Sequence, residues 1–272
     1  MSTAISDEQA DLFANSIFLN AVLPLLRTIV EARPKFQQHW RGRSAVCQVS
    51  CFTNAGRAEK NGTHFRFSDG VCTPERGLYT EGKPDFELEF SSVRHLNNFF
   101  KGVTFPLPRL KGAVRNFPVM LRFMSLLLCM AGLLGSKKAP AAEEDQVLLV
   151  RCMFTLLPRG ISILNKLGHP DLRAWTGSSP DRVYAWAVQG YPELAAYLRI
   201  KKGNSKAGKG QYTRSMPFFT MQFDSPLSAL GILQETDDMI EATIQKRLVM
   251  VGGPEFGAQL GDFMLLVGSY IK

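Results

Sequence analysis

The segment 203–210, GNSKAGKG, has most of the residues of a phosphate-binding P-loop, whose pattern is G-x-x-x-x-G-K-[ST]. A P-loop needs a Ser or Thr hydroxyl for Mg²⁺ and a following helix whose first N–H groups bind the phosphates. Here Gly210 replaces the hydroxyl residue, and Pro217 would break a helix two turns further on. Residues 219–223 then alternate apolar and polar side chains, which is typical of a half-buried strand. The pattern predicts a strand, a basic Gly-rich loop and a second strand, and no nucleotide site.

Four side chains of the first half have the types that bind zinc: Cys47, Cys51, His64 and Cys72. Cys47 and Cys51 lie in AVCQVSCF, which is typical of a strand, and four residues of strand separate the two sulfurs by about 13 Å. Two thiolates on one zinc must each lie about 2.3 Å from the metal. We therefore expect core or surface thiols and no metal site.

Motifs of enzyme chemistry are missing from the sequence. It contains no G-x-S-x-G, no H-E-x-x-H and no G-x-G-x-x-G between a strand and a helix. His39, His64, His95 and His169 stand singly, which favours surface or capping roles over general-base catalysis. We expect no catalytic residue, no cofactor and no enzymatic activity.

The overall composition is that of a globular protein, with 272 residues, 45% hydrophobic and 21% charged, and a net charge of +8. The positive excess favours anionic partners such as membrane surfaces or acidic ligands. Asp7, Glu8 and Asp11 precede any apolar run, which argues against a signal peptide, and the apolar stretch 124–135 is too short to span a bilayer. Five cysteines without an export signal indicate reduced thiols. We expect a cytoplasmic protein.

The elements that must position these residues occur twice in the chain. Pro24 inside an apolar helical pattern corresponds to Pro158 in a second one, and Trp40-x-Gly after the first corresponds to Trp175-x-Gly after the other. FELEFSS from residue 86 and FTMQFDS from residue 219 continue the register. Landmarks in one order at nearly constant separation predict an internal duplication.

Each half then predicts an opening helix, several strands, a short helix, another strand and a closing apolar helix, at 117–134 in the first half and 256–270 in the second. Strands clustered between helices favour the α+β class, with a mainly antiparallel sheet covered by helices on one face. We place the units at 1–135 and 146–272, with the charged segment 136–145 as an exposed linker.

Apolar side chains of the alternating strands and of the helices after them face a common interior in each half. They come from the strand, the short helix and the closing helix: Phe86, Leu88, Phe90, Leu96, Phe99, Phe100, Phe123 and Leu127 in the first half, and Phe219, Met221, Phe223, Leu230, Phe263 and Leu266 in the second. Either these residues fill an ordinary core, or they line a cavity whose Met and Phe walls would suit varied apolar ligands.

The stretches PDFELEFSS, FFKG and PRLKG, followed by an apolar helix, resemble the sterol carrier protein type two family. PFFTMQFDS, IQKRLVMVGG and FGAQLGDFMLL in the second half resemble it too, so the chain looks like a tandem copy. The resemblance implies a five-stranded sheet and helices around an apolar tunnel that binds sterols, fatty acids or fatty acyl-CoA. It also implies a carrier that needs no metal or redox cofactor.

These observations together predict a non-catalytic intracellular lipid-binding and lipid-transfer protein whose lipid contacts are the apolar residues named above. Lys201, Lys202, Lys206 and Lys209 are candidates for contact with an anionic membrane surface or with acyl-CoA phosphates. The alternatives are an interaction scaffold built from two degenerate carrier folds, and an accessory subunit of a lipid-processing enzyme. The sequence lacks the pattern of aromatic and basic residues that is typical of nucleic-acid binding, so we expect no nucleic-acid partner. A homo-oligomer is compatible with the sequence.

Overall fold

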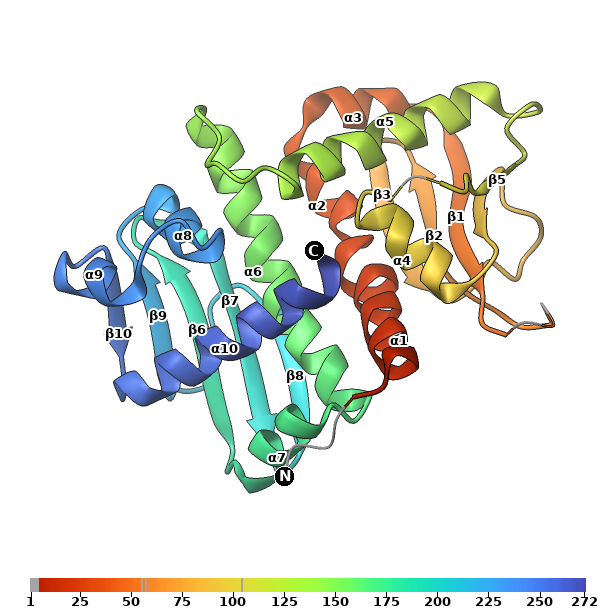
Figure 1. Cartoon of the computed structure of the whole chain (residues 1–272). Helices are drawn as coiled ribbons and strands as arrows, with labels where there is room; N and C mark the ends of the chain where they lie inside the picture. Colours follow the sequence, from red (N-terminus) through yellow and green to blue (C-terminus); the bar gives the residue numbers. More distant parts are fainter. Residues whose placement is uncertain (1–4, 55, 57, 104) are drawn as a thin grey trace. The chain divides into compact units, whose positions relative to one another are not determined.

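The computed structural model describes residues 5–54, 56, 58–103 and 105–272 (Figure 1). The chain divides into two compact units, residues 5–134 with 270–272, and residues 135–269. We call them the N-terminal and the C-terminal unit. The predicted linker 136–145 lies at the start of the C-terminal unit, and its last residues already belong to the helix that begins at Glu143.

The N-terminal unit begins with helical segments and continues into a sheet. Its elements are α1 (Asp7–Ile17), η1 (Phe18–Val22), α2 (Leu25–Ala32), α3 (Pro34–Trp40), β1 (Ser44–Phe52), β2 (Lys60–Ser68), β3 (Val71–Arg76), β4 (Phe86–Phe90), α4 (Val93–Phe100), β5 (Arg109–Lys111) and α5 (Phe117–Leu134). Ser6 caps α1 in a capping box with Gln9. Before Pro24, which has no N–H to donate, the chain passes through the π-helical turn η1.

The C-terminal unit repeats this order with two differences: one continuous opening helix replaces α1, η1 and α2, and an additional short helix precedes the last strand. Its elements are α6 (Glu143–Lys166), α7 (Pro170–Ser178), β6 (Arg182–Val188), β7 (Tyr191–Lys201), β8 (Asn204–Lys209), β9 (Phe219–Phe223), α8 (Pro226–Leu233), α9 (Met239–Ile244), β10 (Leu248–Val251) and α10 (Pro254–Ile271). Here the opening helix α6 continues through Pro158.

Both units contain a five-stranded sheet with the same topology, β3-β2-β1-β4-β5 in one and β10-β9-β6-β7-β8 in the other. The α+β class and the five strands are confirmed. The sheets are mixed, however, and not mainly antiparallel as predicted, because β4 pairs parallel to β1 and β9 pairs parallel to β6.

The parallel pairs arise because the chain crosses back over the sheet before the fourth strand. Segment 77–85 begins with the Gly77 N–H donating to the Gly62 carbonyl (3.0 Å) and ends with the Asp85 N–H donating to the Val46 carbonyl (2.8 Å). In the C-terminal unit, Gly210 and Phe218 donate to the Ala195 and Val183 carbonyls, at 2.8 and 2.9 Å. Each fourth strand therefore starts at the same end of the sheet as the first strand.

The P-loop-like segment lies in a hairpin, but not in the hairpin that the sequence predicts. Lys202 (φ +46°) and Gly203 (φ +78°) form a two-residue turn between β7 and β8, and both positive φ angles suit such a turn. Most of the expected basic loop is therefore strand β8, while β9 pairs with β6. Among the described residues 210–225 no helix begins, so the segment has neither the hydroxyl nor the helix of a nucleotide site.

Helices cover one face of each sheet and form the core with it. In the N-terminal unit the Phe123 ring of α5 lies 5.5 to 6.1 Å from the rings of Phe65, Phe67 and Phe86. In the C-terminal unit Phe154 of α6 lies 6.1 Å from Phe223 of β9. Alternation along the strands directs the remaining side chains to the opposite face of each sheet.

Candidate functional site

The predicted lipid contacts are buried or half-buried in both units. Those on β4 and β9 are buried, as are Leu96, Phe123, Leu127, Leu230 and Phe263, while Phe99, Phe100 and Leu266 are half-buried. The Phe90 ring lies 5.2 Å from Phe99 and 6.0 Å from Phe100, so the strand and the short helix after it do meet in the N-terminal unit. Whether these residues contact a lipid stays a prediction.

The C-terminal unit contains an aromatic cluster with rings from α7, β6, α10 and the residue before β9. The Trp175 ring lies 5.2 Å from Tyr184 and 4.6 Å from Phe263. Phe218, which precedes β9, lies 5.9 Å from Tyr184 and is 38% exposed. The cluster therefore extends from a buried phenol to a partly exposed ring.

The Tyr184 side chain is fully buried, and its hydroxyl has no hydrogen-bond partner among the residues that the structure describes. Burying a hydroxyl without a partner costs about 1–3 kcal/mol, and native structures pair most buried polar groups. Arg182, two residues earlier on the same face of β6, stacks on Phe218 with its guanidinium 4.0 Å from the ring centroid. A hydrogen-bond donor and a cation thus lie beside the same ring.

The corresponding position in the N-terminal unit is a cysteine. Cys47 pairs with Phe86 as Tyr184 pairs with Phe219. Burial raises the pKa of the Cys47 thiol well above its ordinary value, and the charges of Asp85 and Cys72 add to the effect. The thiol therefore stays protonated at neutral pH, when it is a poor nucleophile and metal ligand.

The four residues of the zinc interpretation do not converge on one point. Cys47 and Cys51 lie on the helix-covered face of β1, whereas His64 pairs with Gln48 and lies on the opposite face. Burial also raises the pKa of Cys51, to about 11, against a hydrogen bond from Asn15 that lowers it. Within the described part of the chain, no group of three or more His, Cys, Asp or Glu side chains could hold a metal ion.

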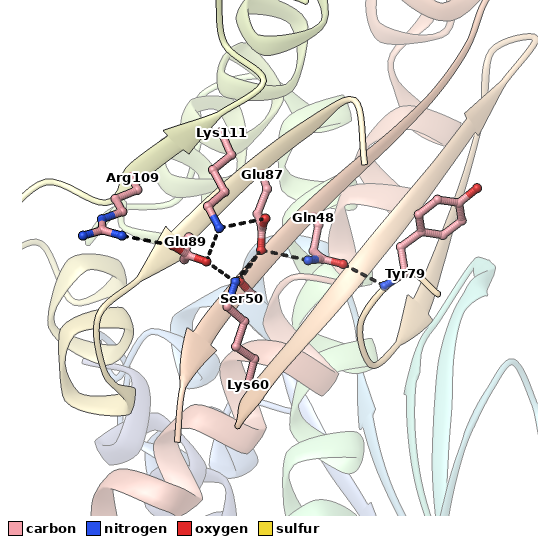
Figure 2. A network of polar contacts seen from close by, with 8 residues as sticks. All are labelled: Gln48, Ser50, Lys60, Tyr79, Glu87, Glu89, Arg109 and Lys111. Atoms are coloured by element: carbon pink, nitrogen blue, oxygen red, sulfur yellow. Dashed lines mark hydrogen bonds and ion pairs between the residues drawn. The ribbon is translucent and has the colours of Figure 1, made fainter. Parts of the chain in front are cut away.

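A buried ionic network covers the opposite face of the N-terminal sheet (Figure 2). The Glu87 carboxylate accepts hydrogen bonds from Gln48 Nε2 (2.9 Å) and Ser50 Oγ (2.6 Å). The Glu89 carboxylate accepts from Lys111 Nζ (2.6 Å) and pairs with Lys60. The two carboxylates are almost fully buried although they lie on a strand of alternating pattern.

Two further groups connect this network to the rest of the unit. Arg109 lies 3.8 Å from Glu89, and the Tyr79 N–H of the crossing segment 77–85 donates to Gln48 Oε1 at 2.7 Å. Burial by itself would raise the pKa of Glu89, but the hydrogen bonds from Lys111 and Lys60 outweigh it and the pKa is lowered. Because both carboxylates are paired with side chains of neighbouring strands, the network acts as an internal cross-link between β1, β2, β4 and β5.

The four lysines of the predicted membrane contact are exposed but do not share one surface. Lys201 ends β7, Lys202 lies in the turn, and Lys206 and Lys209 lie on β8. Since Lys206 and Lys209 are three residues apart on a regular strand, they face opposite sides of the sheet. Lys201 also pairs with Asp181 at 3.4 Å.

In the described chain, three helical stretches are long and apolar enough to cross a bilayer by length and composition: 7–32, 117–134 and 143–166. The first and third are ordinary core helices, because 78% of the apolar window of each is buried. Only 22% of the window is buried in α5. The apolar character of α5 therefore exceeds what packing within the protein requires.

No protein-family model and no curated protein matches this sequence. Among solved structures, the conserved hypothetical protein TT1886 of Thermus thermophilus, described as "possibly sterol carrier protein", is 17% identical, with a TM-score of 0.28 over 40% of this chain and 83% of its own. The sec-alkylsulfatase Pisa1 of a Pseudomonas species is 15% identical, with a TM-score of 0.25 over 57% of this chain and 28% of its own. Likenesses this weak carry no argument about the function.

Tyr184 and the ionic network are the features that the sequence prediction missed. The signal for the network lies in the residues between the phenylalanines, which are Glu87 and Glu89 in β4 but Thr220 and Gln222 in β9. Cations at Lys60, Arg109 and Lys111 could have suggested partners for these carboxylates. Tyr184 has no comparable sequence signal, because the absence of a partner depends on the folded surroundings.

Proposed function

We propose that this chain is a non-catalytic lipid-binding and lipid-transfer protein of the cytoplasm, built from two sterol-carrier-like units in tandem. The observation that carries the proposal is the buried Tyr184 hydroxyl, which has no partner among the described residues, in an aromatic interior. An amphiphile with an oxygen-containing head would accept the hydrogen bond from the phenol. Its apolar body would replace contacts among the rings between the sheet and α10.

The tandem part of the proposal is supported by the matching strand order and register of the two sheets. Both crossing segments make the same two backbone hydrogen bonds at corresponding positions. Both β2–β3 and β7–β8 turn through a pair of residues with positive φ, Asp69-Gly70 and Lys202-Gly203. Shared irregularities of this kind are what a duplication would preserve.

Arg182 favours a guest with an anionic head. A carboxylate beside Phe218 could accept from the Tyr184 hydroxyl and pair with the guanidinium, and a hydrogen bond to a charged group contributes about 1.5–3 kcal/mol. Each apolar Å² that the chain of the guest removes from water adds about 25 cal/mol. Among sterols, fatty acids and acyl-CoA, this arrangement fits a long-chain fatty acid best.

The first test is to purify the full chain natively, extract it with organic solvent and identify any bound lipid by mass spectrometry. We expect a fatty acid in near-stoichiometric amount. The second test titrates the delipidated W40F/W186F variant, in which Trp175 is the remaining tryptophan, with a long-chain fatty acid and with its methyl ester. We expect a saturable change in Trp175 emission, with weaker binding of the ester because it lacks the charge.

An empty extract together with no response to fatty acid, sterol or acyl-CoA would overturn the proposal. Equal affinity for acid and ester would overturn the role of Arg182 while leaving lipid binding in place. Circular dichroism of the variant before and after titration controls for loss of the fold.

A further inference from the structure

Helix α5 presents two apolar stripes, and only one of them packs against its own sheet. Phe123, Leu126, Leu127 and Met130 are buried on this side, and the Phe123 ring lies against rings of β2 and β4. On the other side, side chains at positions i, i+4, i+7 and i+11 form a second stripe. This outer stripe consists of Phe117, Leu121, Met124 and Leu128, of which Leu128 is 68% exposed and Phe117 and Leu121 about half exposed.

The segment before α5 adds further apolar side chains to the surface of the same unit. Val103, Phe105, Leu107, Leu110 and Val114 are all exposed, Phe105 to 76% and Val114 to 98%. Scattered exposed apolar residues are normal, but a concentration of this kind in one stretch of chain is typical of a binding surface. We call these five side chains, together with the outer stripe of α5, the apolar surface of the N-terminal unit.

The charge of the surrounding chain identifies the partner. Between Glu89 and Glu143 the sequence contains no acidic residue and eight basic ones, which equals the net charge of +8 of the whole chain. Arg94 pairs with Asp11, and Arg109 and Lys111 face Glu89. Lys101, Arg115 and Arg122 have no carboxylate within salt-bridge distance among the described residues.

We propose that the apolar surface of the N-terminal unit docks on an anionic lipid bilayer. The outer stripe of α5 would lie in the interface between head groups and acyl chains, while Arg115 and Arg122 reach the phosphates. Each basic side chain near an anionic membrane contributes about 1 kcal/mol of attraction. The docking itself is argued from the apolar and basic side chains of this surface. Only its role, the delivery or uptake of lipid, rests on the proposed function.

Two other occupants fit the observations less well. A bilayer-spanning α5 would have to leave the sheet, because Phe123 packs against three rings of the same unit. A second copy of the chain, placed symmetrically on this surface, would bring its own uncompensated cations against Arg115 and Arg122. An anionic surface satisfies both the apolar and the basic side chains.

The test measures co-sedimentation of the full chain with vesicles of phosphatidylcholine alone and of phosphatidylcholine with phosphatidylglycerol. We expect binding to the anionic vesicles that weakens with salt, and a decrease of about tenfold or more for R115E/R122E. L121S/L128S should weaken binding at low and at high salt, because it removes apolar contact. K206E/K209E on β8 is the matched control, and we expect it to bind within about twofold of the wild type.

Two results would overturn the inference. One is that K206E/K209E loses vesicle binding while R115E/R122E keeps it. The other is that the chain ignores anionic vesicles and instead forms a concentration-dependent dimer that L121S/L128S abolishes. The Trp175 titration with fatty acid separates failure of this inference from failure of the proposed function. The docking variants R115E/R122E and L121S/L128S should leave the affinity for the fatty acid unchanged.

Discussion

The two sheets have the same strand order, yet the polar groups described above, the carboxylates of the N-terminal sheet and the Tyr184 hydroxyl of the C-terminal sheet, lie on opposite faces. In the N-terminal unit Glu87 and Glu89 belong to a buried ionic network on the face away from the helices (Figure 2). By register, the same positions of the C-terminal sheet are Thr220 and Gln222. In the C-terminal unit it is the helix-covered face that contains a polar group unpaired among the described residues, the hydroxyl of Tyr184.

The neighbouring strands show the same difference. Gln48 and Ser50 of β1 correspond to Ala185 and Ala187 of β6. On the edge strands the cations Arg109 and Lys111 correspond to Val249 and Val251. A network of this kind needs all its members, because a single buried charge without a partner is costly. The duplicated topology therefore tolerates two different ways of using polar groups.

This difference suggests a division of labour between the units. The N-terminal sheet satisfies its buried carboxylates internally, while the outer helix stripe of that unit is exposed and suits a membrane. The C-terminal unit leaves a donor unsatisfied in an apolar interior, where a guest could bind it. The predictions below test the comparison from the largest expected effect to the smallest.

Truncating the side chain at the second polar position of the fourth strand, Glu89 or Gln222, should affect the two units very unequally. We expect Glu89→Ala to lower the free energy of unfolding of the N-terminal unit by about 2–4 kcal/mol, because it removes the closer of the two carboxylates that Lys60 and Lys111 share. The cost stays below that of a fully buried pair, since both ammonium groups reach solvent. Gln222→Ala at the corresponding position should change stability by less than about 0.5 kcal/mol.

Denaturant titration with a single tryptophan in each unit measures both effects. Trp40, stacked on Phe67 at 4.0 Å, reports on the N-terminal unit when Trp175 and Trp186 are replaced by Phe, and Trp175 reports on the C-terminal unit. Similar losses for the two variants would show that the network has no special role in the N-terminal unit.

Replacing Tyr184 by Phe should have effects of opposite sign on stability and on binding. Without a guest, the variant should be as stable as the wild type or slightly more stable, because it removes a buried hydroxyl that has no partner in the described chain. Affinity for a fatty acid should fall by about tenfold, the equivalent of one hydrogen bond to a charged group.

Tyr197→Phe is the matched control for this prediction. Tyr197 pairs with Ala185 and therefore lies on the opposite face of the same sheet from Tyr184. Fluorescence titration and thermal unfolding of both variants measure the two quantities. Unchanged affinity in Tyr184→Phe would remove the phenol from the binding site.

Much of this fold follows from the sequence, because hydrophobic period and caps act locally. The apolar pattern predicts the closing helix at 117–134, which is α5, and the alternation of FELEF and FTMQF predicts strands β4 and β9. Ser6 and Gln9 predict the capping box that begins α1. These features depend on side chains close together along the chain, so spacing alone predicts them.

The parallel strand pairs and the buried network could not be predicted in this way. Alternation of Phe and Glu in β4 is equally compatible with carboxylates that face water. They become buried because segment 77–85 crosses that face, where a side chain at Gly62 would lie 2.9 Å from Leu78, and because Lys60 and Lys111 cover them. Which strand a crossing segment reaches is a property of the whole sheet.

The smallest expected effect is the dependence of the N-terminal unit on acid. In the folded protein, the hydrogen bonds that Glu89 accepts from Lys111 and Lys60 outweigh the effect of burial and lower the pKa of Glu89. Ionised Glu89 therefore stabilises the fold at pH values above the ordinary Glu pKa of about 4.3. This stability should be lost as the pH falls from there through the lowered pKa. Glu89→Gln should be less stable than the wild type at pH 7 but lose less stability on acidification, so the two stability curves should converge at low pH.

Denaturant unfolding monitored by Trp40 at several pH values measures the stability of the N-terminal unit in both proteins. Gln222→Glu, which adds a carboxylate at the corresponding C-terminal position, is the comparison variant. Parallel curves for wild type and Glu89→Gln would mean that the network does not set the acid response of the unit.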